Sequence, residues 1–229
     1  MFSHMYIWLA VYFLLWWLFL FFWKKEYRKE MFMVGLLGLI SGPLVQITHL
    51  KDWWQPLFLY NNFSIKIEDL IFGFSMAGVG AVIYQELRGL KEKKVKKLTP
   101  NVLTDFLFIL SPFALFFSLF YFFGIHSFWT SVISLTMMAL FVLKKRADLF
   151  HSMILSGVFL TIIAFIFYII ALSINPAWFE QEWFLDRLSG IFIFSIPIEE
   201  LAWYFFAGLT VSAIWEFVNG LKFVNEGVS

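Results

Sequence analysis

The sequence predicts an all-α integral membrane protein in which seven transmembrane helices form two parallel three-helix repeats joined by a linker helix. Three observations lead to this fold class. Of the 229 residues, 61% are hydrophobic and 14% are charged, whereas soluble domains carry about 25% charged residues. Seven apolar runs are long enough to cross a bilayer, and one acidic segment occurs twice.

The repeated segment indicates internal symmetry. Residues 67–89, IEDLIFGFSMAGVGAVIYQELRG, align without a gap with residues 198–220, IEELAWYFFAGLTVSAIWEFVNG. Two three-helix units keep the same orientation only if an odd number of helices connects them, so a single linker helix is expected. The alignment equates Glu68 with Glu199, Asp69 with Glu200, and Gln85 with Glu216.

The first three spans precede a basic linker. Residues 5–23 are an anchor instead of a signal peptide, because positive charge follows the apolar run. The second span covers residues 31–50 and the third covers residues 67–87, which is followed by the basic stretch RGLKEKKVKKLTP. Between them, Trp53 and Trp54 form either an interfacial aromatic belt or the mouth of a pocket.

Four further spans follow. Residues 102–123 are the linker helix, in which Pro112 predicts a kink. The next two spans cover residues 127–143, which end in a basic KKR sequence, and residues 150–173. The last span is predicted to cover residues 191–218, which include the second acidic segment.

Basic residues predict the orientation of the chain. Cytoplasmic loops are enriched in Lys and Arg, so the N-terminus is predicted to lie outside a multi-pass protein of the cytoplasmic or plasma membrane. The clusters are residues 24–29, 88–97 and 144–146. The predicted division of the chain is residues 1–97 for repeat one, 98–124 for the linker helix and 125–229 for repeat two.

The acids of the repeated segment are the candidate catalytic groups. An ionised carboxylate at the centre of a membrane helix costs roughly 2.5 to 3.5 kcal/mol on insertion scales, so such acids are expected to face the protein interior. A proton donor and a proton acceptor in an aromatic wall suit chemistry on an apolar substrate. The alternative is that these acids are interfacial caps of two helices. The candidates are Glu199, Glu200, Glu68 and Asp69.

Neighbouring positions predict the substrate-binding residues. Pro197 is expected at the start of the acidic helix, with Ser195 near its cap. Adjacent helical residues point about 100° apart, so Glu199 and Glu200 have different neighbours. Glu200, Tyr204 and Ala207 share one face, and Glu199, Trp203 and Phe206 share another. The predicted substrate-binding set is Pro197, Trp203, Tyr204 and Phe206.

Several function classes are excluded by the residues. The chain has no cysteine, and its four histidines show no ligand spacing, so no metal site is expected. A net charge of +1 argues against nucleic acid as a partner. No Gly-x-Gly-x-x-Gly loop is present, which argues against a nucleotide cofactor. No lysine lies between residues 191 and 218, so a retinal Schiff base in the last span is excluded.

A resemblance narrows the function. The motif PIEE at Pro197, Glu199 and Glu200, which precedes an apolar aromatic helix and is duplicated in a seven-span chain, resembles the membrane-integral lycopene cyclase domain family. That family occurs as two small subunits or as a fused tandem repeat. The first copy departs from the motif, because Lys66 stands where Pro197 does.

The resemblance implies a carotenoid cyclase that works without a cofactor. A carboxylic acid protonates the terminal double bond of a linear polyene, an internal alkene attacks the cation, and a carboxylate removes a proton, so the reaction is redox-neutral. The substrate is an apolar polyene or terpenoid, and the surrounding partner is the lipid bilayer. Two other functions stay open at this point, namely a small membrane transporter of the parallel 3+1+3 repeat type and a non-catalytic membrane protein.

Overall fold

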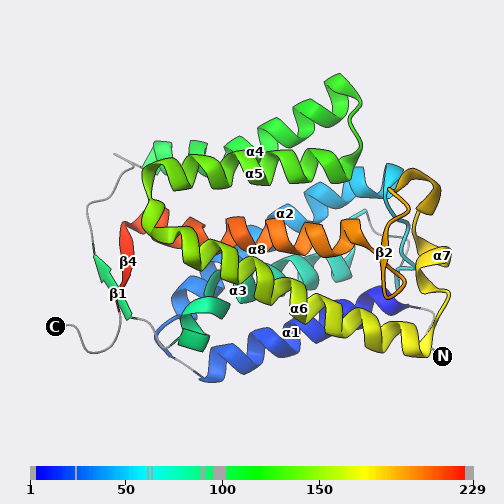
Figure 1. Ribbon diagram of the computed structural model, residues 1–229, viewed down its shortest axis with the longest axis horizontal. Coiled ribbons are helices and arrows are strands. Elements are labelled where there is room, and N and C mark those ends of the chain that lie inside the picture. The colour runs from blue at the N-terminus through cyan, green and yellow to red at the C-terminus, as the bar shows by residue number, and fades with distance from the viewer. Residues whose placement is uncertain are drawn as a thin grey trace.

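The computed structural model describes residues 4–23, 25–60, 62, 64–88, 91–94 and 102–224, and it is a bundle of long helices (Figure 1). Within these residues, seven helices are long and apolar enough to cross a membrane, which confirms the predicted class and makes the chain a multi-pass membrane protein. They are α1 (Met5–Trp23), α2 (Arg28–Asp52), α3 (Ile67–Arg88), α4 (Val102–Phe123), α5 (Ser127–Lys145), α6 (Phe150–Ile174) and α8 (Ile198–Asn219).

Short elements join the long helices at the two ends of the bundle. Helix α7 (Trp178–Glu182) and the hairpin of β2 (Phe192–Ile193) and β3 (Ile196–Pro197) lie at one end in Figure 1. Strands β1 (Lys91–Lys94) and β4 (Leu221–Val224) pair at the opposite end. Two single turns of 3₁₀-helix complete the described elements, at Ala147–Leu149 and Leu185–Arg187.

The predicted start of the last span at residue 191 is wrong. Residues 192–197 form the β2–β3 hairpin, and Phe194 and Ser195 turn the chain with φ of 51° and 64°. Pro197 is the N-cap of α8, as expected for the start of the acidic helix, and Ser195 lies two residues before it; the cap has no side-chain hydrogen bond. A proline has no N–H to continue a helix and disfavours helical geometry in the residue before it, so the apolar run cannot be one helix.

The basic linker after α3 contains a strand that the sequence analysis did not predict. Residues 91–94 pair antiparallel with residues 221–224 directly after α8. The rest of the predicted 88–97 cluster beyond Arg88 and this strand lies outside the described residues. The pairing ties the end of α3 to the end of α8 through backbone hydrogen bonds.

Helices α3 and α8 lie at the centre of the bundle. Helix α3 packs along α2 and α1, α8 packs along α6 and α5, and α3 and α8 contact each other. Several contacts join residues that the repeat alignment equates, which supports a pseudo-two-fold relation between the two units. The division into two repeats and a linker stays a prediction. The equated pairs in contact are Phe72 with Trp203 and Gln85 with Glu216, and the same offset of 131 residues pairs Glu92 with Phe223 in the strand register just beyond the aligned segments.

Glycines let the helices approach closely within each unit. A Cβ atom on Gly38 of α2 would lie 2.0 Å from the carbonyl oxygen of Gly73 in α3. In the other unit, a Cβ on Gly208 of α8 would lie 2.8 Å from the carbonyl oxygen of Ser156 in α6. Small residues at such crossings are the usual means of packing membrane helices. The tight α2–α3 and α6–α8 pairs leave a space between them that becomes the candidate site.

Candidate active site

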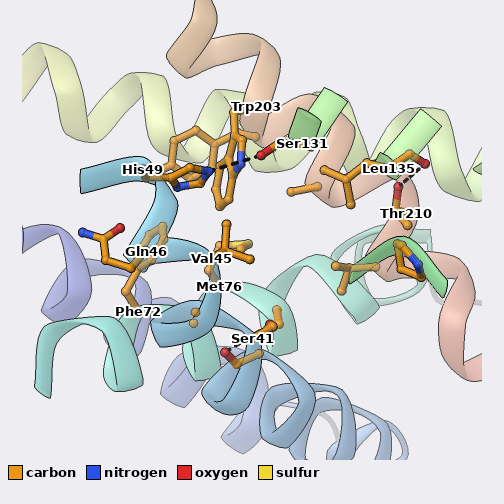
Figure 2. Close-up of a pocket in the computed structure, with 18 of the residues that line it drawn as sticks. Ser41, Val45, Gln46, His49, Phe72, Met76, Ser131, Leu135, Trp203 and Thr210 are labelled. Carbon is orange, nitrogen blue, oxygen red and sulfur yellow. Dashed lines mark hydrogen bonds between the residues drawn. The ribbon is translucent and has the colours of Figure 1, made fainter. Parts of the chain in front are cut away.

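A cavity of about 190 Å³ lies between the two tight helix pairs. Helix α4 closes part of its wall with Ile109, Pro112, Phe113 and Phe116. Along α8 the lining runs from Glu200 to Ile214, which is about 21 Å at 1.5 Å per residue. The site is therefore a long, largely apolar slot beside α8 that begins at the end of the bundle that carries α7 (Figure 1), and Figure 2 shows part of its lining.

Glu200 is the carboxyl group at that end of the cavity. It is the one carboxyl side chain among the described residues that lines the space. Its Oε2 atom accepts a hydrogen bond of 2.7 Å from the Tyr168 hydroxyl of α6, and its Oε1 atom accepts one of 2.6 Å from Nε1 of Trp183, which follows α7. The Glu200 side chain is 8% exposed and is thus held by residues of two other segments of the chain.

This geometry defines where an acidic proton can reside. The indole N–H of Trp183 is only a donor, so Oε1 of Glu200 acts as an acceptor. A proton on Glu200 therefore belongs on Oε2, with the Tyr168 hydroxyl as its acceptor. Tyr168 can then turn its own hydrogen toward the Tyr204 hydroxyl, 3.5 Å away. The carboxyl group can consequently exist in both protonation states without losing its partners.

Glu199 and Glu68 hold loops and do not line the cavity. Oε1 of Glu199 accepts a hydrogen bond of 2.6 Å from the backbone N–H of Ser189, and Oε1 of Glu68 accepts one of 2.7 Å from the backbone N–H of Leu59. Each glutamate thus fixes the segment that precedes its own helix. The two side chains are equated by the repeat alignment and make the same type of contact.

Asp69 makes a tyrosine contact similar to that of Glu200. Its Oδ1 atom accepts a hydrogen bond of 2.8 Å from the hydroxyl of Tyr6 in α1. Tyr6 lines the cavity, whereas Asp69 lies behind it. All four predicted carboxyls are between 1% and 8% exposed, which argues against the alternative that they are solvent-exposed caps.

Two of the four predicted substrate-binding residues line the cavity. Trp203 and Tyr204 do so, and Ala207 joins Glu200 and Tyr204 on the face that helical spacing predicts. Pro197 is buried in β3 and Phe206 is half-buried elsewhere on α8, so neither lines the space.

A comparison with known families found a match in the second half of the bundle. Residues 126–218 match the family model described as lycopene cyclase. This segment is similar to a lycopene cyclase domain. It covers α5 and α6 and nearly all of α8, and it contains Glu200 with its partners Tyr168 and Trp183. Comparison with curated proteins and with solved structures gave no match.

The wall of the cavity is rich in aromatic rings. The Trp203 ring is stacked near Phe72 at 6.2 Å and lies 6.4 Å from the ring of Trp53. Trp53 and Trp54 both line the cavity, so of the two interpretations of these residues the pocket is confirmed.

Polar groups beside Glu200 and in the cavity wall were not predicted from the sequence. Tyr168 and Trp183 lie in apolar surroundings with no motif. Gln46 and His49 of α2 also line the cavity, and Nε2 of His49 lies 3.2 Å from Oγ of Ser131. A signal was present, because Gln46 and His49 are polar residues three apart on one face of an apolar span.

Glu182, the last residue of α7, is a further buried acid. Its side chain is 4% exposed at the end of α7, outside the membrane-spanning helices. Removal from water raises the pKa of the Glu182 carboxyl above its ordinary value, and the nearby Trp178, the Leu57 backbone and His4 partly oppose this effect. The carboxyl group does not line the cavity.

Proposed function

We propose that this protein is a lycopene-type carotenoid cyclase that closes a ring on a linear polyene by an acid-initiated, redox-neutral isomerisation. The observation that carries the proposal is the placement of Glu200. It is the cavity's carboxyl group, it has partners for both protonation states, and it lies within the matched lycopene cyclase segment. An acid at the end of an apolar slot fits an alkene as the group that receives its proton.

The reaction follows from this placement. The proton on Oε2 of Glu200 is transferred to the terminal double bond, which forms a C–H bond and leaves a tertiary cation. The electron pair of an internal alkene attacks that cation and forms the ring C–C bond. A neighbouring C–H bond then loses its proton, and its electrons become the new ring double bond. Substrate and product are isomers, so no oxidant, reductant or cofactor is consumed.

The cavity wall supports the cationic intermediates. Faces of Trp, Tyr and Phe attract a cation by roughly 0.5 to 2 kcal/mol each, more when water is excluded. Trp53, Phe72 and Trp203 surround the end of the slot near Glu200. After proton donation, the Glu200 carboxylate keeps the hydrogen bonds from Tyr168 and Trp183. Hydrogen bonds to a charged group are worth about 1.5 to 3 kcal/mol, so these two donors lower the cost of the charge that develops.

The other predicted acids have supporting roles in this proposal. Glu199 and Glu68 accept hydrogen bonds from the backbone of the segments that precede their helices and hold those segments in place. Asp69 accepts a hydrogen bond from Tyr6, which lines the cavity. The basic clusters favour a protein with its N-terminus outside, which places Glu200 toward the outer side of the membrane.

Pigment analysis in lycopene-accumulating cells tests the proposal. Cells with the wild-type chain are expected to form cyclic carotenoids, and Glu200→Gln is expected to lower ring formation by about 10²- to 10⁴-fold. Glutamine keeps the shape and the hydrogen-bonding capacity of Glu200 but carries no acidic proton. Glu180→Gln, an exposed change in α7, is the matched control and should leave ring formation unchanged. Normal cyclisation by Glu200→Gln at equal protein level would refute the assignment of the acid.

A further inference from the structure

We infer that His49 is the base of the reaction: its Nδ1 atom accepts the proton that leaves the cyclised cation, and Ser131 is the residue that positions it. The inference rests on the proposed function and deepens it, because ring closure needs a proton acceptor as well as a donor. Among the described residues that line the cavity, Glu200 carries the carboxyl group and His49 the imidazole, whereas the remaining ionisable side chains are tyrosine phenols.

The hydrogen bonds around His49 select one tautomer of its ring. Oγ of Ser131 donates its hydrogen to the carbonyl oxygen of Ser127 at 2.9 Å. The contact of 3.2 Å between Oγ of Ser131 and Nε2 of His49 therefore has the imidazole as its donor, with hydrogen on Nε2. In the described part of the chain, Nδ1 of His49 has no hydrogen-bond partner, and in this tautomer it carries a free lone pair. A free imidazole lone pair in a cavity is the feature of a general base.

A short network fixes the position of this pair. The Asp52 carboxylate at the end of α2 accepts hydrogen bonds from the backbone N–H of Ser127 at 2.9 Å and from its hydroxyl at 2.5 Å. Ser127 in turn orients Ser131 one turn further along α5. Because His49 lies three residues before Asp52 in α2, the same contact between the two helices holds both sides of the His49–Ser131 pair.

His49 borders the region in which the cation forms. Its ring packs edge to face with Trp53 at 4.7 Å and lies 6.4 Å from the ring of Trp203. Figure 2 shows His49 directed toward Ser131 with the indole of Trp203 beside it. The two indoles belong to the wall that receives the positive charge, so the base stands next to the carbon atoms that become acidic once the ring has closed.

Loss of a proton from the cyclised cation completes the reaction. The C–H bond beside the cationic carbon breaks, its electron pair forms the ring double bond, and the proton binds Nδ1 of His49 to give an imidazolium. At that point Glu200 is a carboxylate, because it gave its proton in the first step. The imidazolium proton returns to Glu200 by exchange through water, which is not consumed, and the site is restored for the next polyene end.

The test compares His49→Gln with two other variants in lycopene-accumulating cells. Glutamine can keep a donor toward Ser131 but is not a base at neutral pH, so ring formation should fall about 100-fold, at the lower end of general-base effects. The position of the new ring double bond should also shift, because other acceptors then take protons from other carbons. Ser131→Ala should change the same isomer ratio by a smaller amount, and Ser131→Thr should restore it. His151→Gln, an exposed histidine of α6, is the control and should change neither readout.

The outcomes separate this inference from the proposed function. If the wild-type chain forms no cyclic pigment, the proposed function fails and this inference fails with it. If the wild type cyclises, Glu200→Gln is inactive, and His49→Gln keeps both the rate and the isomer ratio, only the role of His49 is refuted. If His49→Gln does not accumulate in membranes, His49→Ala supplied with imidazole decides. Recovery of ring formation with added imidazole supports the base, and no recovery in a folded variant refutes it.

Discussion

Replacing Tyr168 by phenylalanine removes a single hydroxyl from the wall of the active site. That hydroxyl donates to Oε2 of Glu200 at 2.7 Å, and Nε1 of Trp183 donates to the other oxygen of the same carboxyl at 2.6 Å. A hydrogen bond to a charged group is worth about 1.5 to 3 kcal/mol, and 1.4 kcal/mol corresponds to a factor of ten. If Glu200 is the acid, as proposed, it becomes charged as the alkene is protonated, and Tyr168→Phe should slow ring formation by roughly 10- to 100-fold.

Tyr6→Phe is the matched control for this prediction. Tyr6 has the same chemistry and burial as Tyr168, but its hydroxyl donates to Asp69 at 2.8 Å. If Glu200 is the acid, Tyr6→Phe should have a much smaller effect on ring formation than Tyr168→Phe when protein levels in the membrane are equal. Ring formation can be measured as the ratio of cyclic to linear pigment over time. A larger loss in Tyr6→Phe, or no loss in Tyr168→Phe, would contradict the reasoning and favour Asp69.

Two further predictions concern stability. Gly38→Ala should lower the thermal unfolding temperature of the solubilised protein, because the added Cβ would lie 2.0 Å from a backbone oxygen. Such overpacking costs about 1 to 3 kcal/mol or more. Gly80→Ala is the control and should leave the unfolding temperature unchanged, because the nearest atom to its added Cβ lies at 3.4 Å. Equal unfolding temperatures for both variants would argue against the close α2–α3 contact. The raised pKa of Glu182 means that the folded state binds its proton more tightly, so this group's stability contribution is complete below the ordinary pKa of 4.5 and is lost as the pH rises toward the raised value. Glu182→Gln should flatten that decline in pH-dependent unfolding curves, and an unchanged slope would count against it.

The spans were predictable because their signal is local. A run of about 20 apolar residues identifies a membrane helix without knowledge of its neighbours. The same signal failed at residues 191–197, where the apolar composition continues through a hairpin that turns at Phe194 and Ser195. Strand β1 was missed because its lysine-rich sequence has no strand pattern, and the strand exists through its pairing with residues 221–224.

The site was predictable only in part because its geometry is not local. Adjacent acids point in different directions, and the sequence analysis assigned Glu200 to one face with Tyr204 and Ala207. It could not tell which face meets a cavity, so Glu199 and Phe206 were included although they lie elsewhere. Tyr168 and Trp183 stand 32 and 17 residues away from Glu200, and no spacing rule connects them to it.

The two similar acidic segments differ in their contacts with the cavity. Asp69 and Glu200 are equated by the alignment, and each accepts a hydrogen bond from a buried tyrosine. The Glu200 carboxyl also accepts a hydrogen bond from Nε1 of Trp183, the residue that follows α7. Helix α4 packs on α5 and contributes to the cavity wall, so the slot runs along α8 and not symmetrically along α3. Of the two equated carboxyls, Glu200 therefore lines the slot, whereas Asp69 lies outside the lining and contacts Tyr6, which does line it.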